Sequence, residues 1–138
     1  TEKAREGMIV AISSTGDALN APVDIRFGRC FCFVLYDTES GVRTFEPNPY
    51  RTTGEDAALK AAQMLLNRGV RRVFAGQFGT RVEEFFLKRG VQMVALTRPF
   101  VVAEILTMIA KRREASVHDG DRGMREEKQS MFKESEIL

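Results

Sequence analysis

One short segment of the chain concentrates residue types that could bind an anion or a metal. From position 24 it reads Asp-Ile-Arg-Phe-Gly-Arg-Cys-Phe-Cys-Phe, and it holds both cysteines of the 138-residue chain. Arg26 and Arg29 bring fixed positive charge, and Gly28 lets the backbone approach a ligand closely. Cys30 and Cys32 bring thiols, which bind soft metals as thiolates. The segment therefore indicates a site for an anion, for a metal held by sulfur, or for both.

The cysteines also fit an ordinary core. If the segment continues as a strand, Cys30, Cys32 and Val34 share one face, and small buried cysteines are common between covering helices. On spacing alone we favour this interpretation over ligation of a metal, since no Cys-x-x-Cys pair or second Cys/His group accompanies them. A disulfide between positions i and i+2 is unfavourable, so free thiols are expected. The one histidine, His118, lies in a polar stretch and is expected to be solvated.

Two further loops could bring free backbone N–H groups to the same place. Gly76 and Gly79 flank a loop that follows an expected strand and opens an expected helix, and Thr53 and Gly54 precede the helix before it. N–H groups at a helix start attract anions. The carboxyl ends of parallel strands meet at one edge of a sheet, where ligands bind. We therefore expect these loops to converge with the arginine and cysteine segment, although the glycines could serve tight turns alone.

The hydrophobic pattern predicts an α/β domain with a mixed sheet. Strands are expected at residues 8–13, 31–36, 42–46, 71–75 and 91–96, and helices at about 54–69, 80–89 and 99–111. The second and third strands are close enough to form an antiparallel hairpin. The alternation that follows predicts parallel crossovers, so that helices cover both faces of the sheet.

Length and composition predict one domain, at residues 8–112, between a short extension at 1–7 and a charged tail at 113–138. No apolar run is long enough to span a bilayer, and residues 1–7 lack the apolar stretch of a signal peptide, so a reduced cytoplasmic setting is expected. The net charge of +2 and the lack of a basic stripe argue against nucleic-acid binding.

The tail carries apolar residues that could dock on the domain or on a second copy of the chain. A helix is conceivable at about 124–136, and the apolar positions are Met131, Phe132, Ile137 and Leu138. Low hydrophobicity elsewhere in the tail argues against independent order. We therefore expect a monomer or a weak homodimer.

Catalytic residues are not evident in this chain. Ser13 and Ser14 have no histidine nearby in the sequence to serve as a base. Asp17 and Asp24 could form a paired-carboxylate site only if the loop between them folded to bring them together. We therefore rank a carrier or binding protein above an enzyme, with an acid-dependent hydrolase as a third possibility, and assign no catalytic residue.

The order and spacing of several short motifs resemble one family. They are Met8-Ile-Val-Ala-Ile12, Phe27-Gly28-Arg29, Glu46-Pro-Asn-Pro49, Ala61-Ala-Gln-Met-Leu-Leu-Asn-Arg-Gly-Val70 and Val73-Phe-Ala-Gly76. Together they resemble the dinitrogenase iron–molybdenum cofactor biosynthesis family, over roughly residues 7–109. The resemblance implies a ribonuclease H-like fold, a three-layer α/β/α domain with a five-stranded mixed sheet. It also implies a small protein that binds a nitrogenase cofactor, its precursor or a related metal–sulfur cluster without conventional catalysis.

The chain departs from the family pattern at two places. Many members carry histidine before the Phe-Gly-Arg triplet, where this chain has Arg26, and a histidine- and glycine-rich run where this chain reads Tyr50-Arg-Thr-Thr-Gly54. Cys30 and Cys32 could substitute as thiolate ligands of an iron–sulfur or iron–molybdenum–sulfur cluster. Alternatively, Arg26, Arg29 and Arg51 could hold an anionic cluster through charge alone.

Our leading hypothesis is a carrier or scaffold for an anionic metal–sulfur cluster, working with proteins that donate or accept the cluster. Its expected site combines the ligands Cys30 and Cys32 with a cofactor-binding set: Arg26, Gly28, Arg29, Thr53, Gly54, Gly76 and Gly79. The rival hypothesis is a binding module that uses the same fold for a small non-metal anion or a protein partner.

Overall fold

The computed structural model of the chain describes residues 7–54 and 56–119, and its elements follow the predicted order. They are β1 (Ile9–Ser14), β2 (Cys32–Asp37), β3 (Arg43–Pro47), α2 (Ala57–Asn67), β4 (Val70–Ala75), α3 (Thr80–Lys88), β5 (Gln92–Ala95) and α4 (Val102–Asp119). The predicted tail helix at 124–136 and the apolar tail residues lie outside the described residues.

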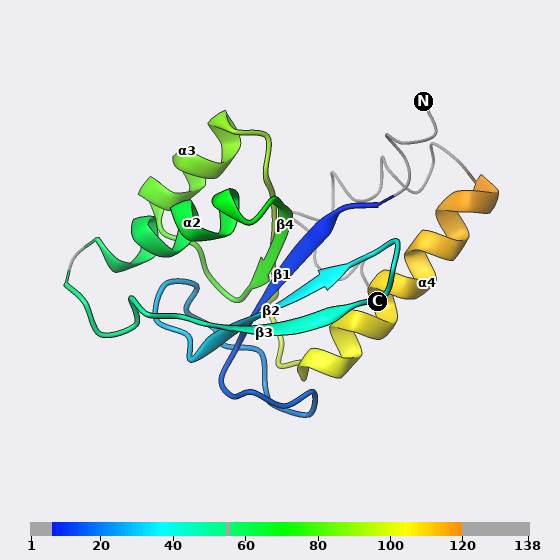
Figure 1. The fold of residues 1–138 in the computed structure, drawn as a ribbon, viewed down its shortest axis with the longest axis horizontal. Helices are drawn as coiled ribbons and strands as arrows, with labels where there is room; N and C mark the ends of the chain where they lie inside the picture. Colours follow the sequence, from blue (N-terminus) through cyan, green and yellow to red (C-terminus); the bar gives the residue numbers. More distant parts are fainter. Residues whose placement is uncertain (1–6, 55, 120–138) are drawn as a thin grey trace.

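The five strands form one mixed sheet in the order β3-β2-β1-β4-β5. β2 pairs antiparallel with both β1 and β3, whereas β1, β4 and β5 are parallel neighbours. Helices α2 and α3 lie on one side of the sheet and α4 lies on the other (Figure 1). The arrangement confirms the predicted α/β fold with a five-stranded mixed sheet and its antiparallel hairpin.

The central strands are apolar on both faces because each face is covered. On the α2 and α3 side, Ala11 of β1 and Phe33 of β2 pack in a cluster with Leu65 and Phe86 from the two helices. On the α4 side, Ile12 of β1 belongs to a second cluster. That cluster also contains Val34, Phe74, Val102, Ile105, Leu106 and Ile109. The continuous apolar run that predicted β1 is therefore explained by burial on two sides.

Two element boundaries differ from prediction. Helix α2 begins at Ala57, after an N-cap at Asp56, and not directly after Thr53 or Gly54. The intervening segment forms its own turns, in which the N–H of Thr53 donates to the carbonyl of Tyr50. Helix α4 continues to Asp119, beyond the predicted end near residue 111, and so includes the backbone of His118. The charged residues that follow position 111 include strong helix formers, so a polar composition did not end the helix.

Two glycines let loops lie directly against neighbouring backbone. A Cβ atom added at Gly28 would lie 2.6 Å from the Cα and Cβ atoms of Ala58 in α2. A Cβ atom at Gly76, directly after β4, would lie 2.7 Å from the Cα atom of Ile25. Real Cβ atoms do not come this close to backbone, so only glycine permits the observed packing. By contrast, nothing lies within 4 Å of a Cβ atom built at Gly54 or Gly79.

No helix in the described part of the chain is both long and apolar enough to cross a membrane.

The Gly28 contact predicts a stability difference between two alanine substitutions. Gly28→Ala should lower the free energy of unfolding by about 1–3 kcal/mol, because the start of α2 must move to relieve the overlap. Gly54→Ala is the matched control in the next loop and should change stability by less than about 0.5 kcal/mol. Urea denaturation of both variants measures this, and equal losses of stability would contradict the packing described.

Candidate functional site

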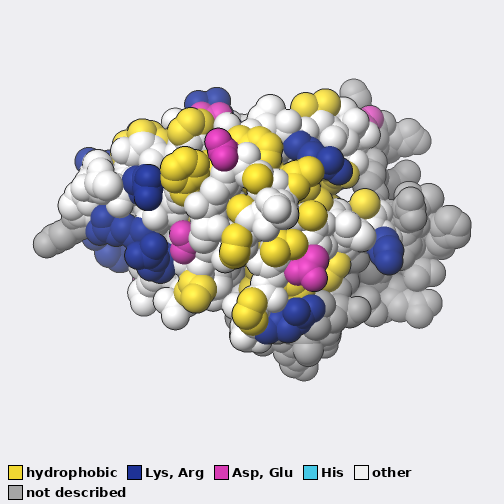
Figure 2. All heavy atoms as spheres, turned by 90° about the horizontal axis from the view of Figure 1, so that it is seen from below, with side chains coloured by type: hydrophobic (Ala, Val, Ile, Leu, Met, Phe, Trp, Pro, Cys, Tyr) yellow, Lys and Arg dark blue, Asp and Glu magenta, His cyan; other side chains and the backbone are white. Residues whose placement is uncertain are grey.

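Three loops lie at the end of the sheet where the carboxyl ends of the parallel strands β1, β4 and β5 are found. We call residues 24–30, 48–54 and 76–79 the rim. The N–H of Gln77 donates to the carbonyl of Ile25 at 2.7 Å, and the N–H of Gly76 donates to the carbonyl of Asp24 at 3.4 Å. Figure 2 shows this end of the molecule, where hydrophobic side chains gather with Lys and Arg side chains around them. Backbone hydrogen bonds thus join the first of these loops directly to the third.

Exposed cationic and apolar groups lie side by side on and next to the rim. The Arg26 side chain is 66% exposed and its Nε lies 3.6 Å from Oδ1 of Asp24. Its neighbour Ile25 is 62% exposed, an unusual fraction for a large aliphatic residue. The guanidinium of Arg51 lies 5.1 Å above the ring of Phe31, which is 40% exposed. The surface therefore offers positive charge next to apolar contacts.

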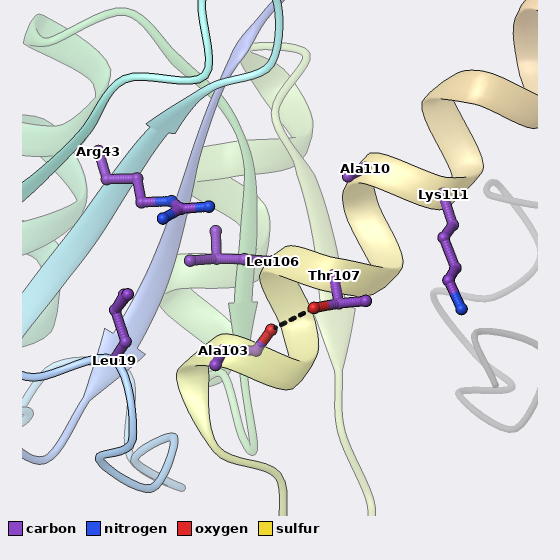
Figure 3. Close-up of a pocket in the computed structure, with 7 residues that line it drawn as sticks. All are labelled: Leu19, Arg43, Ala103, Leu106, Thr107, Ala110 and Lys111. Atoms are coloured by element: carbon purple, nitrogen blue, oxygen red, sulfur yellow. Dashed lines mark hydrogen bonds between the residues drawn. The ribbon is translucent and has the colours of Figure 1, made fainter.

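A separate groove lies away from the rim, between β3 and α4. It has a volume of about 380 Å³, and Arg43, Leu106 and Thr107 are among the residues that line it (Figure 3). The hydroxyl of Thr107 donates to the carbonyl of Ala103 at 3.0 Å. None of the predicted site residues lines this groove, so it is a different surface from the one that the sequence indicated.

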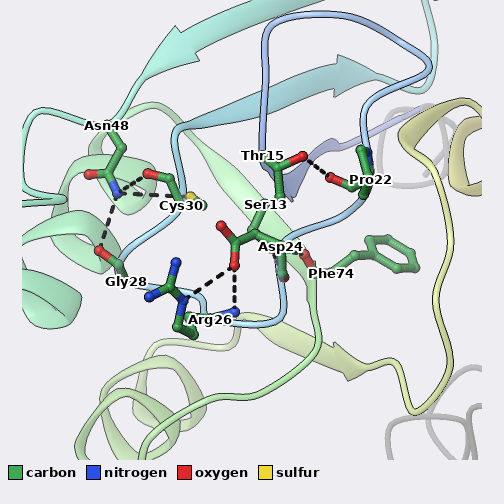
Figure 4. Close-up of polar contacts among 9 residues, drawn as sticks. All are labelled: Ser13, Thr15, Pro22, Asp24, Arg26, Gly28, Cys30, Asn48 and Phe74. Carbon is green, nitrogen blue, oxygen red and sulfur yellow. Dashed lines mark hydrogen bonds and ion pairs between the residues drawn. The ribbon is translucent and has the colours of Figure 1, made fainter.

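Asn48 ties the first two rim loops together. Its side-chain Nδ2 donates to the carbonyls of Gly28 at 3.2 Å and Cys30 at 2.9 Å (Figure 4). Its Oδ1 accepts from the N–H of Tyr50. Asn48 is only 3% exposed, so these bonds satisfy groups that water does not reach. We did not predict this role. The signal was available, because an asparagine between two prolines at the end of a strand is typical of a fixed turn.

Arg29 is a positioning residue for the second rim loop. Its Nη1 donates to the carbonyls of Arg51 at 3.1 Å and Thr53 at 2.8 Å, and its Nη2 donates to the carbonyl of Gly54 at 3.2 Å. These bonds use three of the five guanidinium N–H groups. Arg29 therefore holds Thr53 and Gly54 at the rim, while Arg26 carries the more available charge.

A third set of bonds joins the ends of β1 and β4 to the loop that connects β1 with β2. The hydroxyl of Ser13 lies 2.9 Å from the carbonyl of Asp24 and 3.3 Å from that of Phe74 (Figure 4). The buried Asp24 accepts the N–H of Arg26 through Oδ1 at 2.9 Å. Ser13 and Asp24 therefore stabilise the loop that presents Arg26.

The prediction that Cys30 and Cys32 share one face was wrong. Cys30 packs in the cluster on the α2 and α3 side, together with Phe33. Cys32 lies in β2 two residues before Val34, which belongs to the α4 side, and its Sγ lies 3.3 Å from the carbonyl of Gly16. The reason is that β2 begins only at Cys32, so strand alternation does not extend back to Cys30. Cys30 therefore packs on the α2 and α3 side, whereas Cys32 stands in β2, and both thiols lie close to Ser14 at the end of β1.

Neither thiol is prepared to act as a thiolate ligand. Burial, reinforced by the negative charge of Asp24, raises the pKa of Cys30 from 9.0 to about 12. Burial and the negative charge of Asp17 also raise the pKa of Cys32. Both residues are buried, and no group of three or more Cys, His, Asp or Glu side chains in the described residues could hold a metal ion. The residues present therefore do not fit a cluster ligated by these cysteines in this conformation.

The raised pKa of Cys30 predicts a loss of stability in alkaline solution. Above pH 9 the thiol ionises in the unfolded chain but stays protonated in the folded protein up to about pH 12, so unfolding becomes more favourable as the pH rises. Between these values the free energy of unfolding should fall by up to about 1.4 kcal/mol per pH unit more steeply in the native protein than in Cys30→Ala. Urea denaturation at a series of pH values measures both slopes. Identical slopes would mean that the folded protein already holds a thiolate.

Known structures resemble this chain over most of its length. The apo form of the orange protein from Desulfovibrio gigas matches with a TM-score of 0.70 and 22% identity, covering 77% of this chain and 89% of that one. A protein from Thermotoga (TM1290), assigned to NifB and to the DUF35 family, matches with a TM-score of 0.61 and 26% identity, covering 82% and 89%. The protein PH0822 matches with a TM-score of 0.64 and 21% identity, covering 75% and 91%.

The two matches below 25% identity show a shared fold, which agrees with the sheet described above. No curated protein sequence matches the chain. The family described as dinitrogenase iron-molybdenum cofactor matches residues 8–112, which include all five strands and the whole rim. The chain therefore belongs to the dinitrogenase iron–molybdenum cofactor family.

Proposed function

We propose that this protein carries an anionic metal–sulfur cluster, of the iron–sulfur or iron–molybdenum–sulfur type, as cargo on the rim. The observation that carries the proposal is the Arg26 guanidinium, which stays 66% exposed although it lies 3.6 Å from Asp24, on a loop whose backbone is hydrogen-bonded to Gln77. A fixed cation beside apolar surface attracts an anion more strongly than a cation surrounded by water. Membership of the family supports a cluster over other anions.

The cargo is held by charge and hydrogen bonds, and not by thiolates. Cys30 and Cys32 are buried and protonated, so ligation by both would require the packing around them to open and both thiols to ionise. Arg26 and Arg51 need no such change, because their side chains are exposed. The substitution of the family's usual histidine by Arg26 then replaces a metal ligand with a counter-charge for the whole cluster.

The starts of α2 and α3 contribute to the same surface. The first N–H groups of a helix have no partner within the helix, and they carry partial positive charge. Gly54 and Gly79, which precede the two helices, leave open space where a side chain would otherwise stand. Arg81 of α3 lies 3.4 Å from the Asp56 carboxylate before the start of α2 and offsets its charge, while Glu83 adds an acidic group in the first turn of α3. Sulfide or oxide atoms of a cluster could approach both helices.

A carrier of this kind exchanges its cargo with other proteins. Cargo held without covalent ligands can be released without breaking metal–protein bonds, which suits transfer between a donor and an acceptor of the cluster. We assign no catalytic residue: the carboxylate of Asp24 is buried and bonded to Arg26, as expected of a structural group.

The test is anaerobic loading with iron and sulfide, with and without molybdate, followed by measurement of bound metal and visible absorbance. Arg26→Gln should weaken retention of the cluster about tenfold, the usual scale for loss of one charge partner at a partly exposed site. Arg89→Gln is the matched control, because Arg89 stacks on Phe85 at the far end of α3. The variant with Cys30→Ser and Cys32→Ser should still bind.

The possible outcomes separate the two modes of binding. If the cysteine variant loses the visible absorbance of the cluster and Arg26→Gln keeps it, binding by charge is contradicted and ligation by the thiolates is supported. Equal binding by native protein, Arg26→Gln and Arg89→Gln would place the cargo away from the rim. If no variant retains metal under any of these conditions, the carrier proposal itself fails.

A further inference from the structure

The outer edge of β3 is open to pairing with another strand. β3 is the terminal strand of the sheet, and four of its five residues are exposed while Glu46 is half-buried. Val42 accepts the N–H of Asp37, and the N–H of Asn48 donates to Phe31. Because bonding alternates along an antiparallel pair, the even-numbered residues of β3 face β2 and the backbone groups of Arg43 and Phe45 face outward.

The outward groups have no partner within the part of the chain that the structure describes. No hydrogen bond among residues 7–54 and 56–119 uses the backbone N–H or C=O of Arg43 or Phe45. Apolar side chains are also exposed along this edge, since Val42 is 58% and Phe45 36% exposed. Unpaired edge groups together with exposed apolar residues are the features through which sheets join other strands.

The groove beside Arg43 favours an apolar occupant over an anion. Its lining includes Leu19 and Leu106, and the Arg43 side chain reaches from β3 toward Leu106 (Figure 3). Lys111, the other cation at the groove, points away from Arg43, so the two charges do not converge on one ligand (Figure 3). Phe45 lies on this same face of the sheet, since it pairs with Val34 of the α4-side cluster.

We propose that β3 is a self-association surface, where the β3 strands of two copies pair antiparallel about a two-fold axis at Thr44. This register places Arg43 of each copy opposite Phe45 of the other and uses the N–H and C=O groups of both residues on each strand. Side chains directly opposite in such a pair are neighbours. Each Arg43 guanidinium, already 5.8 Å above the ring of Tyr36, then meets a second aromatic ring at the mouth of the groove.

A second copy fits this edge better than a flexible peptide does. Pro47 ends the strand and has no N–H to donate, so the free edge is short. A flexible peptide would lose much conformational entropy on binding and gain few hydrogen bonds, whereas a strand that is already fixed in a sheet loses little conformational entropy. The pairing is also closed, because each copy uses its one β3 edge, so it yields dimers and not fibres. The rim residues take no part and remain available.

The proposal is tested by sedimentation velocity across a concentration series, with circular dichroism as the check on folding. The native protein should show a dimer whose population rises with concentration. Phe45→Lys places like charges opposite each other across the axis and should raise the dimer dissociation constant at least about tenfold. Leu87→Lys is the control, because Leu87 is also a large hydrophobic residue, is 61% exposed and lies on α3, away from β3. It should leave the dissociation constant unchanged.

A charge-reversal pair makes the test specific for this register. Adding Arg43→Glu to Phe45→Lys places Glu opposite Lys at both cross-strand positions, so the dimer should return. Raising the salt concentration should strengthen the native dimer, because the two Arg43 groups are diagonal neighbours across the axis. A native protein that stays monomeric at every concentration would overturn the proposal. So would a dimer that survives Phe45→Lys, or one that the double variant fails to restore in a folded protein.

Discussion

The structure depends on one constraint: loop backbone that packs out of reach of water must still find hydrogen-bond partners. At the rim, the partners come from side chains. The Asn48 amide serves the carbonyls of Gly28 and Cys30, and the Arg29 guanidinium serves three carbonyls of the next loop. With Gly28 pressed against Ala58, these bonds fix the loop that carries Arg26. The rim loops are thereby held in fixed positions relative to the sheet.

This rigidity has a consequence for binding. A cation on a mobile loop loses both backbone and side-chain entropy when it binds an anion, whereas on a fixed loop only the side chain becomes ordered. Arg26 is presented next to the exposed Ile25, and the open position at Gly79 leaves space before the start of α3, whereas the start of α2 packs against Gly28. A carrier must also release its cargo, and binding through several weak polar contacts allows this more readily than bonds between metal and thiolate.

Most of the fold could be predicted because the spacing of apolar residues and the positions of turn residues indicate helices and strands locally. The buried runs, the stops at glycine and the alternation of strands with helices led to the correct sheet and to loops meeting at one edge. What could not be predicted were interactions between residues distant in sequence. Arg29 binds carbonyls 22 to 25 residues away, and no local pattern indicates that contact. The face of Cys30 was mispredicted because β2 begins only at Cys32, and the carbonyl of Cys30 instead accepts from the amide of Asn48, 18 residues later.

The central claim is that the rim binds an anionic metal–sulfur species without using the thiols. The most direct measurement is an amide NMR titration of nitrogen-15-labelled protein with tetrathiomolybdate, a diamagnetic anion that combines molybdenum with sulfur. The account predicts saturable shifts confined to the amides of residues 25–29, 52–54 and 77–81, which weaken as salt is added. Shifts centred on Cys30 and Cys32 and their strand neighbours, insensitive to salt, would contradict it.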